Sequence, residues 1–527
     1  MADHPTHRAT WQRWRESLRA FRHPRVITML FLGFSAGIPL LLIFSSLSLW
    51  LREAGVERSA VTFFSWAALA YSFKFIWAPL VDRLPLPGLT RWLGRRRAWI
   101  LLAQGGIIAA IGTMAAIDPA SGAHPLTLMA LAAVLLGFAA ATQDIAIDAY
   151  RIESAPAELQ AMLSSTYIAG YRIGMLAAGA GALFLASHFG SDAGSYRYEA
   201  WRAAYGVMAG LMLVGVVTTL LIPEPLSYRP PAGAHAARDY GGFLLVFAAA
   251  VGGFVACFAL TAQPAGHASS GLAAPGALAV AGLRLALALA VAAAIVALLA
   301  RAGLASPALF RETYVEPVRE FFVRYGLKAS LLLLALVGVY RISDIVLGVI
   351  ANVFYQDLGF SKVEIASVVK TFGLFMTIAG GFVGGLLALR YGVMRMLFLG
   401  ALLSAATNLL FLALAAMGRE LWMLYVVIAA DNLSAGLASA AFVAFLSSLT
   451  DIRFTAMQYA IFSSLMTLLP KLLGGYSGTL VDAMGYDGFF VLTALLGLPV
   501  LLLVWRAGLL LPPQRPVPSA SDAAGPP

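Results

Sequence analysis

The sequence predicts an all-α polytopic membrane protein with two six-helix halves and an inserted two-helix hairpin. Three observations lead to this fold class. Hydrophobic residues make up 60% of the 527 residues and charged residues only 12%, whereas a soluble protein has roughly 45–50% and 25%. The apolar residues lie in runs of about 20, the length that crosses a bilayer. Lys and Arg cluster between these runs.

Fourteen apolar runs can be counted along the chain. The first six predict transmembrane helices near 26–50, 59–81, 98–117, 125–149, 160–187 and 202–222. Two more follow near 241–262 and 273–300. The last six lie near 328–354, 363–389, 394–416, 420–449, 456–482 and 488–511. The first run is too long for the apolar region of a cleaved signal peptide, so we expect a retained helix.

The spans and the loops between them predict the domain organisation and the orientation. The expected segments are a basic N-terminus (1–25), an N-terminal six-helix bundle (26–222), a linker (223–240), the inserted hairpin (241–300), a second linker (301–327), a C-terminal six-helix bundle (328–511) and a disordered tail (512–527). Arginines concentrate in alternate loops, so the positive-inside rule places both termini and both linkers in the cytoplasm. The same bias accounts for the net charge of +10, and we expect no nucleic-acid partner.

The two halves carry traces of an internal repeat. A shift of 299 residues lays "SSTYIAGYRIGMLAAGAG", which begins at Ser164, over "SSLMTLLPKLLGGYSGTL", which begins at Ser463. This shift aligns Arg172 with Lys471, so a basic residue recurs near mid-span in both halves. Repeated halves with a site between them are typical of secondary transporters. Small-residue motifs such as "GGFVGG" (380–385) are expected to permit close helix packing.

Charged residues inside the spans are the candidate functional groups. A charge at the bilayer centre costs at least about 2.5–3.5 kcal/mol on insertion scales, so a retained one indicates function. Counting from the span ends places Arg172, Arg341, Lys370 and Lys471 in the membrane, with Asp344 and Asp431. The basic excess favours an anionic solute. The predicted substrate-binding set is these four basic residues with Gln143, Tyr171 and Tyr340. Lys74 is expected instead to reach the cytoplasmic interface.

Two interpretations remain open for Arg341 and Asp344. Their spacing of three residues places them on one helix face, where they can form an ion pair. The pair is then either a structural lock between helices or a working pair. In the second case Arg341 holds substrate and Asp344 binds and releases a coupled proton. Asp144 is the second candidate for proton coupling, and Asp431 completes the set.

The stretch "QDIAIDAYRIE" (143–153) predicts a gate. Asp144, Asp148 and Arg151 fall at helix positions i, i+4 and i+7, which share one face in the cytoplasmic third of the span. Asp148 and Arg151 can pair in one state and separate in another, as gating requires. A purely structural network with the neighbouring basic loop explains the same spacing.

The basic loop after the second span resembles a known transporter motif. "APLVDRLPLPGLTRWLGRRR" is a lengthened form of the major facilitator pattern G-x-L-x-D-R-x-G-R-R, in which Asp82, Arg83, Arg95 and Arg96 take the matching positions. The resemblance implies a major facilitator fold in which these four residues act in gating. In the second half, "GGLLALRYGVMR" has Leu389 where the pattern has an acidic residue, so that copy lacks the charge pair.

A more specific set of motifs resembles the AmpG family of muropeptide permeases. The matching segments are "FKFIWAPLVDR", "GRRRAW", "TQDIAIDAY", "GYRIGML", "YRISDIV" and "SAAFVAFLSS", within a likeness that covers about 21–511. The resemblance implies a proton symporter with alternating access. It would import anhydromuropeptides (GlcNAc-1,6-anhydroMurNAc peptides) across the bacterial inner membrane for peptidoglycan recycling, with effects on β-lactamase induction. The proton gradient would supply the energy without a cofactor, and we expect a monomer.

Two alternatives come from other sequence features. The "QDIAID" pattern is also similar to one in the acetyl-coenzyme A transporter family, whose substrate is anionic too. Asp144 and Asp148 have the D-x-x-x-D spacing with which an intramembrane transferase can hold Mg²⁺. That chemistry needs a second acidic cluster, and the sequence has none; it also lacks a His-Glu zinc motif and a nucleophile elbow. We therefore expect neither an enzyme nor a metal site.

Overall fold

The computed structural model describes residues 22–43, 45–56, 71, 73–191, 195–225, 237–269, 274–304, 306–361, 364–474 and 477–511. Nearly all of these residues are helical, and none belongs to a β-strand. The chain divides into two compact units, the first made of 1–228 with 325–527 and the second of 229–324. The first unit contains the described parts of both predicted halves, and the second contains the inserted hairpin.

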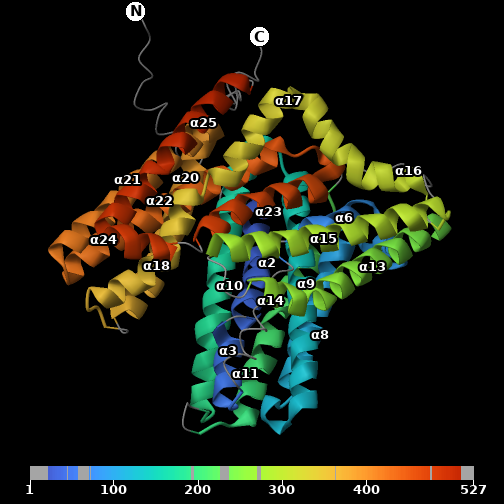
Figure 1. Ribbon diagram of the computed structural model, residues 1–527, viewed down its shortest axis with the longest axis horizontal. Coiled ribbons are helices and arrows are strands. Elements are labelled where there is room, and N and C mark those ends of the chain that lie inside the picture. Colours follow the sequence, from blue (N-terminus) through green and yellow to red (C-terminus); the bar gives the residue numbers. More distant parts are fainter. Residues whose placement is uncertain are drawn as a thin grey trace, which may run out of the picture. The chain divides into compact units, whose positions relative to one another are not determined.

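The N-terminal half is a bundle of long apolar helices. Figure 1 shows α2, α8, α9, α10 and α11 side by side. Its helices are α2 (Pro24–Ile43), α3 (Ser45–Glu53), η2 (Lys74–Ile76), α6 (Ala78–Arg83), α7 (Leu89–Leu93), α8 (Arg95–Ala115), η3 (Pro119–Ser121), α9 (Ala123–Ser154), η4 (Ala157–Leu159), α10 (Gln160–His188), α11 (Tyr198–Leu211) and α12 (Leu213–Leu221). At one end of this bundle Trp50 stacks on Trp201 with ring centroids 5.6 Å apart.

The C-terminal half repeats this architecture. In Figure 1 its helices α20, α21, α22, α24 and α25 form a second bundle. The elements are α17 (Glu316–Val339), α18 (Ile342–Asp357), η6 (Ile365–Phe372), α20 (Gly373–Tyr391), α21 (Val393–Met417), α22 (Leu421–Leu449), η7 (Ile452–Phe454), α23 (Thr455–Gly474), α24 (Ser477–Leu495) and α25 (Gly497–Leu510). The first predicted span of the C-terminal half (328–354) is broken between Val339 and Ile342, where α17 ends and α18 begins.

The number of spans differs from the sequence prediction. Twelve helices among the described residues are long and apolar enough to cross a membrane, not fourteen. Each of the twelve coincides with a predicted span. The predicted span 59–81 falls largely on 57–70, outside the described residues. The predicted span 456–482 is represented by α23, which contains Pro470 and is not among the twelve.

Glycines bring the long helices of each half into backbone contact. A Cβ atom on Gly37 of α2 would overlap the backbone oxygen of Tyr171 on α10, and one on Gly174 would overlap the oxygen of Phe34. In the other half, a Cβ on Gly384 would lie 2.7 Å from the Cα of Leu437. The expectation of close packing at "GGFVGG" is therefore confirmed. Without side chains between them, the helices pack through their backbones, as membrane helices with small residues do.

Substituting Gly37 with alanine is expected to destabilise the N-terminal half. The added methyl group meets backbone, which cannot rotate away, so α2 and α10 must separate at a cost of roughly 1–3 kcal/mol. Gly210→Ala on α11 is the matched control, because nothing lies within 4 Å of its Cβ position. Thermal unfolding of the purified variants tests this, with a lower midpoint expected for Gly37→Ala alone. Equal midpoints would contradict the close packing.

The second unit is a hairpin of two long helices followed by a helical connection. It contains α13 (Ala237–Leu260), α14 (Ala262–Ser269), α15 (Ala274–Arg301), α16 (Pro307–Phe310), η5 (Arg311–Val315) and the start of α17. The segment 301–327, predicted as a linker, is therefore largely helical. Arg284 of α15 donates from Nε to the backbone oxygen of Phe258 at 3.1 Å and stacks on the Phe258 ring. It thereby satisfies a carbonyl in the last turn of α13.

Candidate functional site

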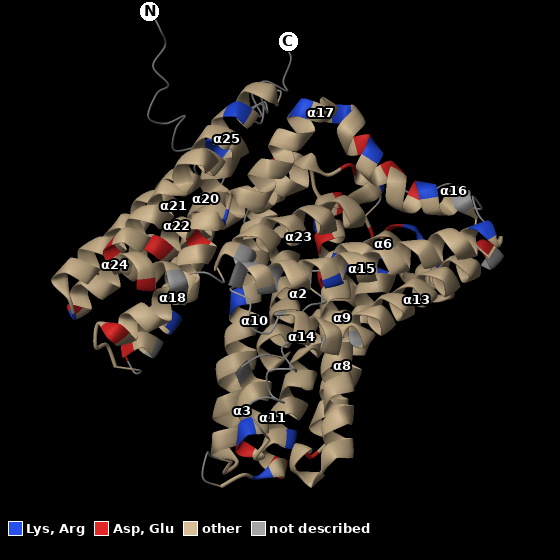
Figure 2. Cartoon of the chain, viewed as in Figure 1, with Lys and Arg blue, Asp and Glu red and all other residues tan. Residues whose placement is uncertain are grey.

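Charged residues join the two halves near the basic loop. Figure 2 shows charges gathered around α6 and α23, whereas most of each long helix is uncharged. The Asp82 carboxylate, at the end of α6, accepts hydrogen bonds from the backbone N–H groups of Ala456 at 3.0 Å and Met457 at 2.9 Å. These groups are at the N-terminus of α23, where the helix dipole favours a negative charge. Asp82 thus fastens the N-terminal half to the C-terminal half.

Arg96 organises the same contact from the start of α8. Its side chain is 1% exposed and lies between the carboxylates of Asp82 and Glu153. The Nη2 atom donates to Asp82 Oδ1 at 2.7 Å and to Thr455 Oγ1 at 2.5 Å, and Nε donates to Glu153 Oε1 at 3.0 Å. A buried charge of this kind is tolerated only when oppositely charged partners surround it. We call Asp82, Arg96, Glu153 and Thr455 the inter-half lock.

The other two basic residues of the loop motif lie beside this lock. Arg95 Nη1 donates to the backbone oxygen of Asp82 at 2.6 Å, and Arg95 Nη2 is 3.4 Å from Glu153 Oε1. The guanidinium of Arg83 lies 5.5 Å from the centroid of the Phe454 ring in the C-terminal half. All four predicted gating residues of the loop therefore gather where the halves meet.

Glu224 holds the start of α8 in place. Its carboxylate accepts from the backbone N–H groups of Arg96 at 2.8 Å and Arg97 at 3.1 Å, so it acts as a cap supplied from the end of the sixth span. Gly94 precedes the helix with a φ of 88°, and a Cβ there would collide with the Glu224 side chain. The lock thus depends on a residue that the loop motif does not contain.

Replacing Glu224 with alanine is expected to lower the free energy of unfolding by about 0.5–2 kcal/mol, the usual effect of removing a helix cap. Transport should fall as well, because Arg96 follows the capped turn. Glu420→Ala is the control, since Glu420 also precedes a helix but makes no side-chain cap bond. Thermal unfolding and uptake measured on both variants check the prediction. A Glu224→Ala protein that matches Glu420→Ala in both would exclude the positioning role.

A second contact between the halves centres on Arg151. This side chain is fully buried, and its Nη2 atom is 3.2 Å from Asp148 Oδ1 on the same helix. Its Nη1 atom donates to Ser447 Oγ of the C-terminal half at 2.8 Å. Its guanidinium lies 5.1 Å from the ring centroid of Tyr459, on α23. The predicted Asp148–Arg151 pair is present, and it extends across the boundary between the halves.

Lys74 does not reach the membrane interface, contrary to the expectation from the sequence. It is 4% exposed, forms an ion pair with Asp144, and lies 3.9 Å from Asp148 Oδ2. Tyr167 donates its hydroxyl hydrogen to Asp144 Oδ1 at 2.9 Å. Lys74 is the first residue of the 3₁₀ turn η2, and its ammonium group contacts carboxylates of α9. Lys74 therefore joins the two carboxylates that the sequence assigned to coupling and gating.

The C-terminal half holds a second charged cluster where α17 and α18 are interrupted. Arg341 Nε is 2.9 Å from Asp344 Oδ2, and Arg341 Nη1 donates to Ser439 Oγ at 2.7 Å. Ser404 donates its hydroxyl hydrogen to the other oxygen of Asp344. Tyr340, predicted to bind substrate, is buried; its hydroxyl donates to Leu397 O at 2.9 Å and its ring stacks on Phe442.

Arg172, on α10 of the N-terminal half, lies within electrostatic range of Arg341 in this cluster. The Arg172 side chain is exposed, and Arg341 and Tyr171 interact with it electrostatically. No carboxylate pairs with Arg172 among the residues that the structure describes. Asp431 is partly exposed, and its carboxylate interacts electrostatically with Asp344 and Arg341. Among the described residues the region thus holds two arginines, Arg172 and Arg341, and two aspartates, Asp344 and Asp431.

The remaining predicted residues lie apart from this region or outside the described part. Gln143 is fully buried and donates to Ser35 Oγ on α2 at 3.5 Å, so it contacts a neighbouring helix. Lys370 is exposed on the π-helical segment η6. The side chain of Lys471 lies outside the described residues. Sequence reasoning missed Glu153, Thr455 and Glu224, whose positions become meaningful only once the halves are packed.

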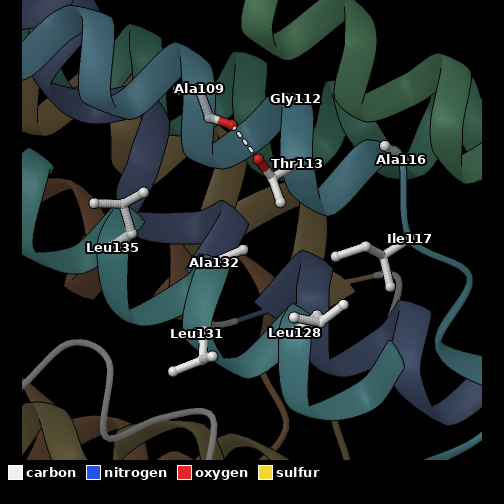
Figure 3. A pocket seen from close by; sticks show the side chains of 9 residues that line it. All are labelled: Ala109, Gly112, Thr113, Ala116, Ile117, Leu128, Leu131, Ala132 and Leu135. Carbon is white, nitrogen blue, oxygen red and sulfur yellow. Dashed lines mark hydrogen bonds between the residues drawn. The ribbon is translucent and has the colours of Figure 1, made fainter. Parts of the chain in front are cut away.

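A groove elsewhere on the N-terminal half has a different character. It has a volume of about 740 Å³ and lies between α8 and α9, where Leu128, Leu131 and Leu135 line it (Figure 3). The one hydroxyl group in its lining, on Thr113, donates to Ala109 O at 2.8 Å. The groove offers a charged solute no polar partner. It does not compete with the charged clusters as a transport site.

Comparison with known proteins decides the family. The profile described as "Major Facilitator Superfamily" matches residues 332–527, and the one described as "Acetyl-coenzyme A transporter 1" matches 26–215. A solved structure of a proton:xylose symporter bound to 6-bromo-6-deoxy-D-glucose has the same fold, with a TM-score of 0.57 and 13% identity. That similarity covers 94% of this chain and 96% of the symporter. The chain belongs to the major facilitator superfamily. It is a multi-pass membrane transporter and not an enzyme.

Two relatives show which transporters this chain is similar to. The "Anhydromuropeptide permease" of Escherichia coli (strain K12) is 28% identical, over 93% of this chain and 81% of the permease. The "Putative transporter AmpG 4" of Rickettsia conorii is 29% identical, over 92% of this chain and 97% of the relative. The alternative of a magnesium-dependent transferase is wrong. The family is one of transporters, and Lys74 and Arg151 occupy the carboxylates that the metal would need.

Proposed function

We propose that this transporter imports anhydromuropeptides from the periplasm to the cytoplasm by proton symport, in the bacterial inner membrane. The observation that supports the proposal is that Arg172 and Arg341, from opposite halves, lie within electrostatic range of each other, with no carboxylate paired with Arg172 among the described residues. A muropeptide bears several carboxylates, and each can form a charge-assisted hydrogen bond with a guanidinium. Peptidoglycan recycling would follow from this import, and a change in β-lactamase induction would follow from its loss.

The charged contacts between the halves support alternating access. The inter-half lock and the Arg151–Ser447 contact both lie towards the end that carries the basic loop, which the positive-inside rule assigns to the cytoplasm. Arg172 and Arg341 lie beyond them, further from that end. Such an arrangement corresponds to a transporter closed towards the cytoplasm and accessible from the periplasm. Opening the two contacts would release the solute inward.

Asp344 supports the proton-coupling part of the proposal. It is paired with Arg341, so a proton on Asp344 and a substrate carboxylate on Arg341 influence each other through one guanidinium. Protonation frees Arg341 for the substrate, and release of the proton returns Arg341 to Asp344. This competition couples the two solutes, because each changes the affinity of the other.

Acetyl-coenzyme A is the second candidate substrate. It is favoured by the profile match over residues 26–215, which covers most of the N-terminal half. It is also anionic, so the two arginines alone do not separate the candidates. Two features of the C-terminal half, Asp344 and its partner Arg341, lie outside that match.

Uptake into liposomes tests the proposal. The purified protein is given labelled anhydromuropeptide or labelled acetyl-coenzyme A, with and without an inward proton gradient. We expect gradient-driven uptake of the muropeptide, and we expect Asp344→Asn to lose it while retaining exchange at equal pH. Gradient-driven uptake of acetyl-coenzyme A alone would replace the substrate assignment. Asp344→Asn uptake that still responds to the gradient would move coupling to another carboxylate.

A further inference from the structure

Three charged side chains of α9 and Lys74 of η2 form a ladder of alternating sign. Asp144 pairs with Lys74, Lys74 lies 3.9 Å from Asp148, and Asp148 pairs with Arg151 at 3.2 Å. The side chains of Asp144, Asp148 and Arg151 are 18%, 8% and 0% exposed, so the ladder runs from an accessible group to a sealed one. Its last member bonds to Ser447 of the opposite half. We call these four residues the charge ladder.

We propose that Lys74 transmits protonation of Asp144 to the contact between Arg151 and the C-terminal half, and thereby opens the cytoplasmic side. This inference rests on the proton symport proposed above and identifies a residue through which it acts. In the present arrangement the ladder is neutral, with two carboxylates and two cations. Each cation has its own carboxylate, and both halves remain in contact.

A proton on Asp144 changes this balance. Lys74 then has one ionised carboxylate within reach, Asp148, and the two cations compete for it. Arg151 is fully buried, and a buried cation that loses its partner is strongly unfavourable. The penalty is relieved when water reaches Arg151. Water can reach it once Ser447 and Tyr459 of the C-terminal half move away, so protonation favours the state open to the cytoplasm.

The other titratable groups around Asp144 are tyrosines, which are uncharged near neutral pH, or members of the charge ladder. Among the described residues, the titratable groups acting on it or near it are the tyrosines Tyr71, Tyr167 and Tyr171, with Lys74 and Asp148. Tyr459 of α23 interacts electrostatically with both Asp144 and Asp148, and Arg151 interacts with Asp148. Lys74 is therefore the cation that links Asp144 to the rest of the ladder. Its position on the short turn η2, rather than inside a long helix, leaves it free to shift between two carboxylates on one face.

A distance measurement between the cytoplasmic ends of the halves tests the ladder. Spin labels are attached at Arg91→Cys and Ile452→Cys, both exposed positions, in a Cys257→Ser background of the full chain in lipid nanodiscs. Double electron–electron resonance then measures the distribution of distances between the two labels at several pH values. We expect Asp144→Asn, which imitates the protonated state, to shift the population to longer distances at every pH. Wild type should make this shift only on acidification.

The double variant Lys74→Gln/Asp144→Asn decides the role of Lys74. It leaves one cation, Arg151, with one carboxylate, so the ladder stays balanced and the protein should fold. We expect its distances to remain short at every pH. Long distances in the double variant, or short ones in Asp144→Asn, would overturn the proposal. Asp344→Asn, measured with and without Lys74→Gln, serves as a control. Its effect on the distances should be the same in both backgrounds.

The outcomes separate this inference from the proposed function. The spin-label distances need no solute, so a wrong substrate assignment leaves them unchanged. A wild type whose distances do not respond to pH would contradict the ladder and leave coupling through Asp344 intact. A wild type that responds, with Lys74 having no influence, would contradict the ladder and leave symport intact.

Discussion

Replacing Arg96 with alanine is expected to have the largest effect on the fold of any single change in the inter-half lock. The substitution removes the cation that the buried carboxylates of Asp82 and Glu153 share, and it leaves Glu153 with the longer contact to Arg95 at 3.4 Å. Breaking a buried ion pair by removing one partner costs roughly 3–5 kcal/mol. Asp82 must also keep its bonds to the start of α23 while repelled by Glu153. We expect a strongly lowered unfolding temperature and no transport.

Arg91→Ala is the matched control for Arg96→Ala. Arg91 belongs to the same basic loop but is exposed on α7, so its loss should change the unfolding temperature little. The variant Arg96→Ala/Glu153→Gln removes the uncompensated charge and should recover part of the stability. It should not recover transport, because the bridge to Thr455 is still missing. An Arg96→Ala protein as stable as Arg91→Ala would contradict the electrostatic description of the lock.

Replacing Arg172 with alanine is expected to weaken substrate binding without unfolding the protein. A hydrogen bond to a charged group contributes about 1.5–3 kcal/mol, so the half-saturating muropeptide concentration should rise roughly 10- to 100-fold. The unfolding temperature should hold, because Arg172 is exposed and pairs with no carboxylate among the described residues. Uptake measured over a range of substrate concentrations, with thermal unfolding in parallel, provides both values.

Two further variants make the Arg172 result specific. Arg172→Lys keeps the charge but loses the planar guanidinium, so we expect an intermediate loss of affinity. Arg202→Ala removes an exposed arginine whose partner, Glu199, is also exposed, and should change nothing. If Arg172→Ala transported muropeptide with wild-type affinity, substrate recognition would have to lie elsewhere.

Much of the architecture follows from the sequence because membrane helices are specified locally. Apolar length predicts each of the twelve candidate spans, and the i, i+3 spacing predicts the Arg341–Asp344 pair. The loop motif singles out Asp82 and Arg96, which form an ion pair in the structure. These features depend on residues close together along the chain.

Other parts of the site depend on packing that no local pattern reveals. Lys74 sits among aromatic residues, a setting typical of an interfacial lysine, yet in the 3₁₀ turn η2 it pairs with Asp144. Glu224 follows the sixth span in a proline-flanked stretch predicted as a linker, and it caps α8 instead. Tyr340 looks like a substrate residue beside Arg341, but a stacked Phe442 covers its ring. In each case the partner is more than 50 residues away, so the assignment required the fold.

Counterflow provides the most direct test of the central claim, that this protein carries anhydromuropeptides. Liposomes containing the protein are loaded with unlabelled muropeptide and given a trace of labelled muropeptide outside, at equal pH on both sides. Because no gradient is needed, the result does not depend on which carboxylate binds the proton. We expect transient accumulation of label, which disappears in Arg172→Ala at the same trace concentration. No accumulation of muropeptide, with accumulation in parallel liposomes loaded with acetyl-coenzyme A, would contradict it.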